Sequence, residues 1–145
     1  LFSVPTDMTV EECKRKNNGM TPGEKILFDI EFFMEEWERL FKEKDIPQSG
    51  SYSKPFDLVV CSPRELDYLN DRGMGKLFKW VCPGIRDEWM AKDHQERTTG
   101  VLEALEKGAR WVVMATQVVK GNPKNGIYPE ESRQRTLEEI RKFKG

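Results

Sequence analysis

One short segment in the second half of the chain combines residue types that suit phosphate binding. Pro83 and Gly84 follow an apolar run there, and Arg86 comes two residues later. Glycine lets a ligand approach the backbone closely, and an arginine guanidinium offers a planar fork of donors to a phosphate. Residue types and spacing alone predict no more than a phosphate-binding α/β protein.

The other reactive residue types suggest no further site. Cys13, Cys61 and Cys82 are odd in number, widely spaced and free of any CxxC pair, which favours reduced thiols in a cytoplasmic protein over a zinc site. His94 is the only histidine, and its polar surroundings favour a solvent-facing side chain over an acid or base. We expect no metal and no cofactor. Four carboxylates are expected to form a solvated helix face: Glu31, Glu35, Glu36 and Glu38.

The composition is that of an ordinary, rather polar globular chain. It has 145 residues, 37% hydrophobic and 34% charged, with a net charge of −1. This length suits a single domain, residues 1–145, with one core. The balanced charge favours neither nucleic acid nor an anionic membrane, and no apolar run reaches the roughly 18 residues of a membrane span. The start at Leu1 resembles neither a signal peptide nor a native start, so we expect that an upstream segment was cleaved or omitted.

Apolar runs of strand length alternate with amphipathic stretches of helical spacing. The runs cover residues 1–5, 57–62, 77–82 and 111–114, and runs that are apolar on both faces suit buried parallel strands. Helix starts are marked by Thr9 and Thr21, each with Glu three positions on, by Ser62-Pro63, and by Thr98 or Thr99. The helix after Thr21 should be about six turns long, and a final helix should cover residues 129–143.

Four strands, each followed by a helix, predict a parallel sheet with crossover helices. Such units form either an open sheet or half of an eight-stranded barrel, which usually needs about 250 residues. In these barrels the chemistry lies in the loops after the strands. The corresponding segments here are residues 6–12, 62–65, 83–97 and 115–123.

Five segments together resemble the carboxyl-terminal half of orotidine 5'-phosphate decarboxylases, over Val4 to about Ile140. Each segment alone is weak evidence, but their order and spacing match the family. The resemblance implies half of a TIM (β/α)8 barrel, namely its strands 5–8, and an enzyme that converts orotidine 5'-phosphate to UMP and carbon dioxide in pyrimidine biosynthesis. The matching segments are Val4–Thr9, Asp57–Glu65, Cys82–Arg86, Asp93–Arg97, and Glu103–Ala109 with Trp111–Met114.

The resemblance also implies roles for individual residues. Thr6 would lie at the substrate, and Thr9 either near the pyrimidine ring or only at a helix cap. Pro83, Gly84 and Arg86 would line the base and phosphate end of the site. The remaining substrate-binding positions would be a glutamine in the polar loop and two residues after the last strand: Gln95, Ala115 and Thr116.

The chain departs from the family in two places. The family commonly has Gly-Arg at the positions of Ala115 and Thr116, so the charge that grips the phosphate is missing there, and a neutral hydrogen bond is about half as strong as a charge-assisted one. The family's Asp-x-Lys-x-x-Asp pattern, whose lysine protonates the carbon as carbon dioxide leaves, does not occur in residues 1–145. We therefore expect no catalytic residue in this chain and no activity without an amino-terminal half.

Partners and alternatives follow from the same resemblance. A half-barrel would leave sheet edges and half a core exposed, so we expect it to pair with an amino-terminal half or a second copy, and the complete barrel to form a homodimer. The first alternative is a half-barrel module that has lost the chemistry. The second is another phosphate-binding barrel, such as a sugar-phosphate isomerase or aldolase relative, which the Val-Val-Cys-Ser and Pro-Gly-Ile-Arg stretches disfavour.

Overall fold

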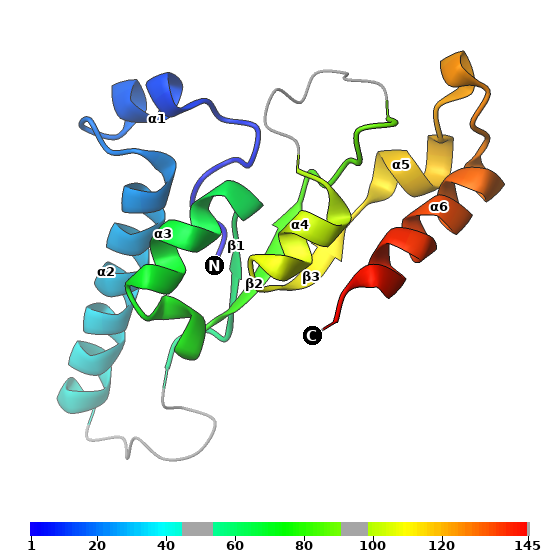
Figure 1. The fold of residues 1–145 in the computed structure, drawn as a ribbon. Helices are drawn as coiled ribbons and strands as arrows, with labels where there is room; N and C mark the ends of the chain where they lie inside the picture. The colour runs from blue at the N-terminus through cyan, green and yellow to red at the C-terminus, as the bar shows by residue number, and fades with distance from the viewer. Residues whose placement is uncertain (45–53, 91–98, 145) are drawn as a thin grey trace.

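Three parallel strands form the centre of the molecule, with helices packed against one face of the sheet and flanking its sides (Figure 1). The computed structural model describes residues 1–44, 54–90 and 99–144. The strands pair in chain order as β1-β2-β3, both neighbouring pairs parallel. The elements are α1 Val10–Lys16, α2 Pro22–Glu43, β1 Leu58–Val60, α3 Leu66–Asp71, β2 Lys79–Pro83, α4 Val101–Glu106, β3 Ala109–Val113, α5 Ala115–Lys120 and α6 Pro129–Lys142, with short 3-10 turns at Pro63–Glu65, Met74–Lys76 and Pro123–Asn125.

The first predicted strand, residues 1–5, forms only an isolated parallel bridge between Phe2 and Val60. The Val60 N–H donates to the Leu1 carbonyl at 2.7 Å, and the amino terminus of Leu1 donates to the Leu58 carbonyl at 2.6 Å. The chain then leaves the sheet, because Ser3 donates through its hydroxyl to Asp29 on α2 and Pro5 has no N–H. The described residues thus contain a parallel three-stranded sheet, consistent with part of a barrel, and the predicted fourth strand is not confirmed.

The helix starts predicted for the first half of the chain are confirmed. Thr9 accepts from the Glu12 N–H and caps α1. Thr21 and Glu24 form a complete capping box at α2, whose 22 residues make about six turns. Just after α1 ends, Asn18 and Gly19 adopt positive φ angles of 52° and 86°, which a helix cannot continue through.

Two predictions in the second half were wrong. Thr99 does not begin a helix but forms a parallel bridge with Ile85, and α4 starts one residue later, after Gly100. Thr98 lies outside the described residues. The stretch 115–123, predicted as a loop, contains the short helix α5.

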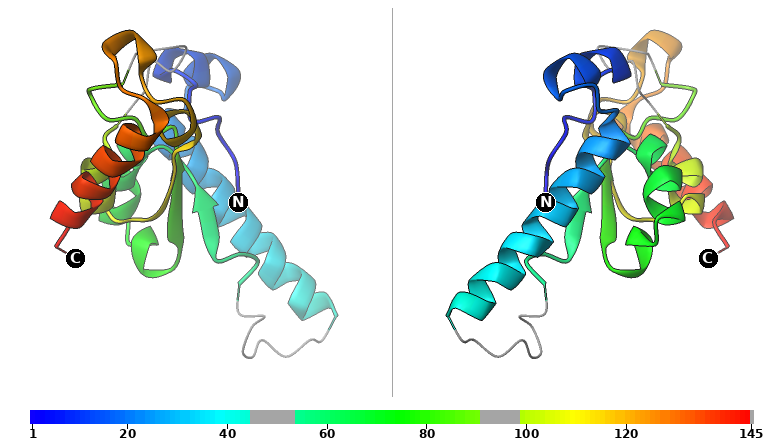
Figure 2. Two further views of the ribbon diagram at one scale, coloured as in Figure 1. Left: turned by 90° about the vertical axis from the view of Figure 1, so that its right-hand side faces the viewer. Right: turned by 90° about the vertical axis from the view of Figure 1, so that its left-hand side faces the viewer.

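The two faces of the sheet differ in burial. Side chains alternate between the faces of a strand, and Val59, Trp80 and Cys82 lie beneath the helices as part of the core. The other face carries Leu58, Trp111 and Val113, which remain 42%, 44% and 49% exposed. α2 and α6 flank the two sides of the sheet (Figures 1 and 2). One face of this sheet is therefore an open apolar surface.

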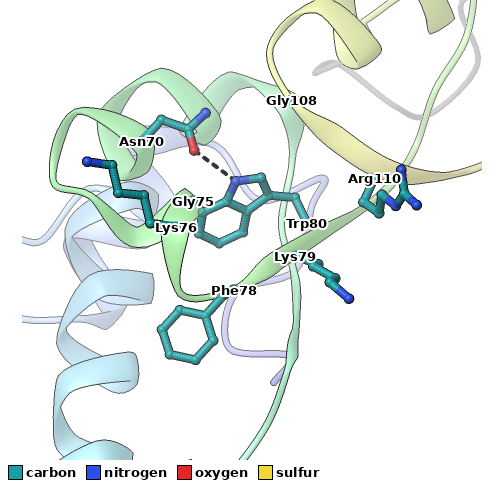
Figure 3. A pocket seen from close by; sticks show the side chains of 8 residues that line it. All are labelled: Asn70, Gly75, Lys76, Phe78, Lys79, Trp80, Gly108 and Arg110. Carbon is teal, nitrogen blue, oxygen red and sulfur yellow. Dashed lines mark hydrogen bonds between the residues drawn. The ribbon is translucent and has the colours of Figure 1, made fainter. Parts of the chain in front are cut away.

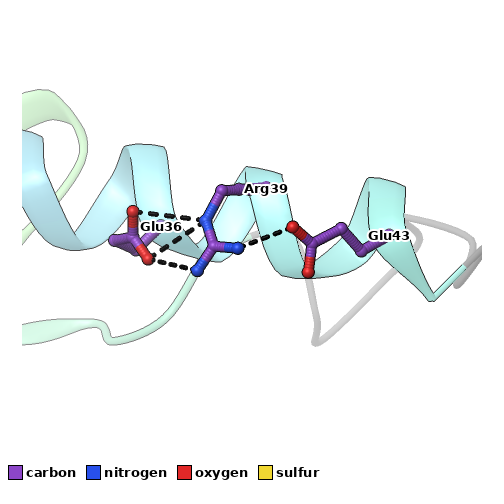
Figure 4. Close-up of polar contacts among 3 residues, drawn as sticks. All are labelled: Glu36, Arg39 and Glu43. Carbon is purple, nitrogen blue, oxygen red and sulfur yellow. Dashed lines mark hydrogen bonds and ion pairs between the residues drawn. The ribbon is translucent and has the colours of Figure 1, made fainter.

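The helix α2 approaches the helix α3 closely at Gly23, which has no side chain. A Cβ at Gly23 would meet the Tyr68 ring of α3 at 2.9 Å, so glycine permits this contact. The carboxylates of α2 are solvated as predicted: Glu31, Glu35 and Glu38 are exposed and Glu36 is half-buried. Phe28 and Phe32, on the same side of the helix, are also exposed. Arg39 pairs with Glu36 at 2.7 Å and with Glu43 at 2.6 Å (Figure 4). These hydrogen bonds lower the pKa of Glu36 and raise that of Arg39, as expected of a solvated helix face.

Candidate functional site

The predicted substrate-binding residues that the structure describes lie at one end of the sheet. Pro83 is the last residue of β2, and Ala115 and Thr116 begin α5 directly after β3. Thr9 caps α1 beyond the turn that follows the first segment. Figure 1 shows α1, α5 and the segment after β2 at the same end of the sheet. This is the edge at which parallel α/β proteins carry their chemistry, because the carboxyl ends of all strands meet there.

The backbone after β2 is held by neighbours on both sides of its turn. Gly84 has a φ angle of 75°, a conformation that glycine adopts at little cost. Ile85 is buried and bridges Thr99, and the Arg86 N–H donates to the Thr99 carbonyl at 3.0 Å. The turn therefore places the Arg86 side chain at a fixed point of the edge.

The structure brings two of the predicted residues into contact. The Arg86 guanidinium donates through Nη2 to the Thr116 hydroxyl at 3.4 Å, a long hydrogen bond between half-buried groups. Arg86 thus lies next to the position where the family commonly carries its own arginine. Gln95 and His94 lie outside the described residues.

Thr6 and Thr9 belong to the α1 side of the same edge. Both are half-buried. The Thr9 oxygen accepts the Glu12 N–H at 3.1 Å, which confirms the capping role. The hydroxyl hydrogen remains a separate donor, so the cap is compatible with a contact to a ligand.

A buried polar pair next to Arg86 and Thr116 was not predicted. The Asp87 N–H donates to Gln117 Oε1 at 2.9 Å, and Gln117 Nε2 donates to the Asp87 carboxylate at 2.6 Å. Gln117 is completely buried and Asp87 is 9% exposed. The two loops that follow β2 and β3 are therefore joined at consecutive residues, first by Arg86 and Thr116 and then by this pair.

The pair is anchored on two helices. Asp87 Oδ1 accepts the Val101 N–H at 2.9 Å and so takes the place of a cap at the start of α4, which is why Thr99 is not needed there. Gln117 Nε2 also donates to the Thr136 hydroxyl of α6 at 2.8 Å, and the Ser132 hydroxyl donates to the Gln117 carbonyl. The one signal in the sequence is the i,i+4 spacing of Ser132 and Thr136, two hydroxyls on the inward face of an otherwise charged helix.

A pair of thiols lies deeper under the same edge. Cys61 and Cys82 are free cysteines with no exposed surface. The hydrogen bond with Cys82, together with burial and the nearby Glu65, raises the pKa of Cys61. A thiol in such surroundings stays neutral and unreactive, so Cys61 is part of the core rather than a nucleophile.

A separate cavity lies at the opposite end of the sheet (Figure 3). It has a volume of about 370 Å³ and surrounds Trp80, whose indole N–H donates to Asn70 at 2.9 Å. Lys76, Lys79 and Arg110 line it and are exposed. In Figure 3 the two lysine side chains point in different directions. Because its cations do not converge on one point, the cavity does not form a phosphate site.

Among the described residues, no cluster of three or more histidine, cysteine, aspartate or glutamate side chains could hold a metal ion. None of the helices in this part of the chain is both long and apolar enough to cross a bilayer.

The fold and the position of these residues define a parallel α/β protein with its candidate site at the carboxyl ends of the strands. In sequence, the chain is similar to curated orotidine 5'-phosphate decarboxylases. It is 38% identical to the enzyme of Syntrophomonas wolfei subsp. wolfei over 66 residues, covering 45% of this chain and 27% of the relative. The match to the Lactobacillus johnsonii enzyme is 35% over 72 residues, covering 50% and 30%.

A longer match reaches most of the chain. The enzyme of Geobacter sp. strain M21 is 27% identical over 141 residues, which cover 91% of this chain and 56% of the relative. No family model matches the chain. The predicted resemblance to orotidine 5'-phosphate decarboxylases is thus confirmed, and the chain matches about half or less of the length of these relatives.

Proposed function

We propose that this chain supplies the nucleotide- and phosphate-binding part of an orotidine 5'-phosphate decarboxylase, which converts the substrate to UMP and carbon dioxide. The observation that carries the proposal is the contact between Arg86 and Thr116 at the carboxyl edge of the sheet. Thr116 stands where the family commonly has arginine, and Arg86 supplies a guanidinium within hydrogen-bonding distance of it. The missing charge is thereby replaced from the neighbouring loop.

The remaining substrate-binding residues have complementary roles in this proposal. Gly84 and Pro83 form the turn on which the base and phosphate end rests, and the positive φ of Gly84 supports this role. The backbone N–H of Ala115 and the amide of Gln95 would bind phosphate oxygens. Thr6 and Thr9 would face the pyrimidine from the α1 side.

The chemical step requires residues that this sequence does not contain. No Asp-x-Lys-x-x-Asp pattern occurs in residues 1–145, so the lysine that protonates carbon and its neighbouring aspartates would come from the other half of the barrel. The open sheet face with Leu58, Trp111 and Val113 supports this arrangement, because the strands of that half would bury it. The closed barrel would form a homodimer.

A non-catalytic half-barrel is the second candidate. The observation that favours it is the loss of the family's Gly-Arg at Ala115 and Thr116, since a phosphate held by neutral donors is bound more weakly. The two candidates differ in one measurable property. The enzyme reading requires that UMP binds and that release of carbon dioxide from orotidine 5'-phosphate depends on this chain.

The first test is a calorimetric titration of the intact natural protein with UMP, compared for Arg86→Ala and Arg110→Ala. Removing a charge-assisted contact to phosphate costs about 1.5–3 kcal/mol, so Arg86→Ala should weaken binding about tenfold or more. Arg110 lies at the opposite end of the same sheet and serves as the matched control, with an unchanged dissociation constant expected. Equal binding by both variants would contradict the role of Arg86.

Native mass spectrometry with and without UMP separates the two candidates. If the chain associates with a polypeptide of roughly 100 residues or more, or is continuous with one, and each barrel takes up one UMP, the enzyme proposal gains support. A monomer or self-dimer of this chain alone that takes up no UMP would favour the non-catalytic module.

A further inference from the structure

A second pair of residues joins the same two segments next to the contact between Arg86 and Thr116. One residue further along each loop, Asp87 and Gln117 form two hydrogen bonds of 2.9 Å and 2.6 Å. The loop after β2 and the start of α5 are therefore fastened at two successive positions. The first position is half-buried and the second is buried.

The orientation of the Gln117 amide is fixed by its partners. Its oxygen faces a main-chain donor, the Asp87 N–H, which can only donate. Its nitrogen faces the Asp87 carboxylate and the Thr136 hydroxyl, and that hydroxyl in turn donates to the Ser132 carbonyl at 2.8 Å. Both hydrogens and the oxygen of the amide are thus used. A buried polar network with all members paired holds a single geometry.

This network fixes the backbone on the carboxyl side of Arg86, while the hydrogen bond from the Arg86 N–H to Thr99 fixes Arg86 itself. A free arginine side chain loses rotamer entropy when it is immobilised. An arginine that is already held near its bound position loses less when a ligand arrives, and this raises affinity.

We infer that Gln117 is a positioning residue, which clamps Asp87 and thereby holds the Arg86 guanidinium against the start of α5, where a phosphate would bind. The inference rests on the proposed function for the identity of the ligand. Gln117 itself touches no ligand in this account. Its effect on binding should therefore depend entirely on the presence of Arg86.

The test exchanges donor and acceptor within the pair. Gln117→Glu places a second carboxylate against Asp87, and Asp87→Asn places an amide donor against the Gln117 amide, so each single variant breaks the match. The double variant, Asp87→Asn with Gln117→Glu, restores one donor facing one acceptor and keeps the Val101 N–H bonded. All are made in the intact natural protein, with Asn70→Ala at the far end of the sheet as a control for lost stability alone.

The UMP dissociation constant is the first readout. We expect each single variant to raise it about threefold to tenfold, the double variant to return it towards the natural value, and Asn70→Ala to leave it unchanged. In an Arg86→Ala background, Gln117→Glu should have no further effect. If Gln117→Glu weakens binding equally with and without Arg86, or the double variant gives no recovery, the positioning role is wrong.

The second readout needs no nucleotide and follows the Arg86 side chain itself. Its Nε–H resonance, identified by its loss in Arg86→Ala, should move towards the position of a solvent-exposed arginine in Gln117→Glu and return in the double variant. An unmoved resonance would overturn the inference, even if UMP binds. Conversely, the resonance could move in Gln117→Glu and return in the double variant although the protein binds no UMP. That result would support the positioning role of Gln117 and show that UMP is not the ligand. If Gln117→Glu does not fold, Asp87→Asn and the double variant give the same comparison.

Discussion

Polar side chains are arranged differently at the two ends of the sheet: they are buried and paired at the carboxyl end and exposed at the amino end. At the carboxyl end, Asp87 and Gln117 are buried and every hydrogen bond of the Gln117 amide has a protein partner. At the amino end, Lys79 and Arg110 are exposed around a cavity, where Asn70 accepts from the Trp80 indole N–H at 2.9 Å and donates to the Lys107 carbonyl at 3.0 Å. The amino end has more cations but no common focus. Cationic side chains therefore form a phosphate-binding site only where the surrounding residues hold them towards one point.

The largest effect should come from the carboxyl end. Asp87→Ala removes the acceptor of the buried Val101 N–H and of the Gln117 amide. A buried donor left without a partner costs about 1–3 kcal/mol, so we expect a loss of about 3 kcal/mol in the free energy of unfolding, measured by urea denaturation. Asp67→Ala is the control, because Asp67 is largely exposed and pairs with Lys107 at 3.0 Å. Such an exposed pair contributes about 0.2–1 kcal/mol. If Asp67→Ala and Asp87→Ala lowered the free energy of unfolding equally, the proposed difference between buried and exposed polar groups would be wrong.

A pH dependence of intermediate size should mark the same end. Burial against Cys82 raises the folded-state pKa of Cys61, so the unfolded chain loses this proton first. The stabilising contribution is complete below the unfolded pKa of about 8.5 and falls as pH rises above it, by about 1.4 kcal/mol per pH unit. Between pH 8 and pH 10 we expect a loss of about 2 kcal/mol from this group.

Urea denaturation at several pH values measures this loss. The control is Cys61→Ala, which lowers stability at every pH but should flatten the decline between pH 8 and pH 10. The comparison concerns slopes rather than absolute values, because the variant also leaves a gap in the core. An identical slope in both proteins would show that Cys61 does not titrate differently on unfolding.

The smallest effect should come from the amino end. Asn70→Ala removes the acceptor of the Trp80 indole N–H and an exposed hydrogen bond from Asn70 to the Lys107 carbonyl. The neighbouring cavity lets water take the place of the Asn70 oxygen, so we expect a loss near the lower limit for an unpaired buried donor, about 1 kcal/mol. Urea denaturation followed by tryptophan fluorescence measures it. A loss as large as that of Asp87→Ala would mean that the two ends are equally preorganised.

Much of the local structure could be read from short stretches of sequence. The cap at Thr9 and the capping box at Thr21 and Glu24 depend only on residues within one helical turn. The three later strands were predicted within two residues of their observed bounds, because a run of buried apolar residues is a local signal. The position of Arg86 at the carboxyl end of β2 followed from the same pattern.

What failed depended on contacts between distant residues. The sequence pointed to Thr98 or Thr99 as the start of α4, but Asp87 reaches the Val101 N–H from a different loop. Residues 115–123 looked like a loop, and Gln117 gave no signal, since its partners lie 19 and 30 residues away. No local pattern encodes such pairs.

The sequence by itself determined the parallel α/β class, the edge of the sheet that carries the candidate site and the resemblance to orotidine 5'-phosphate decarboxylases. These follow from periodicity and short motifs, which need only neighbouring residues. Only the tertiary structure decided that Arg86 lies against Thr116, that Asp87 and Gln117 lock the two loops together, and that one sheet face stays open. Each of these depends on which segments meet in space, where burial makes an unpaired polar group costly and so selects one arrangement.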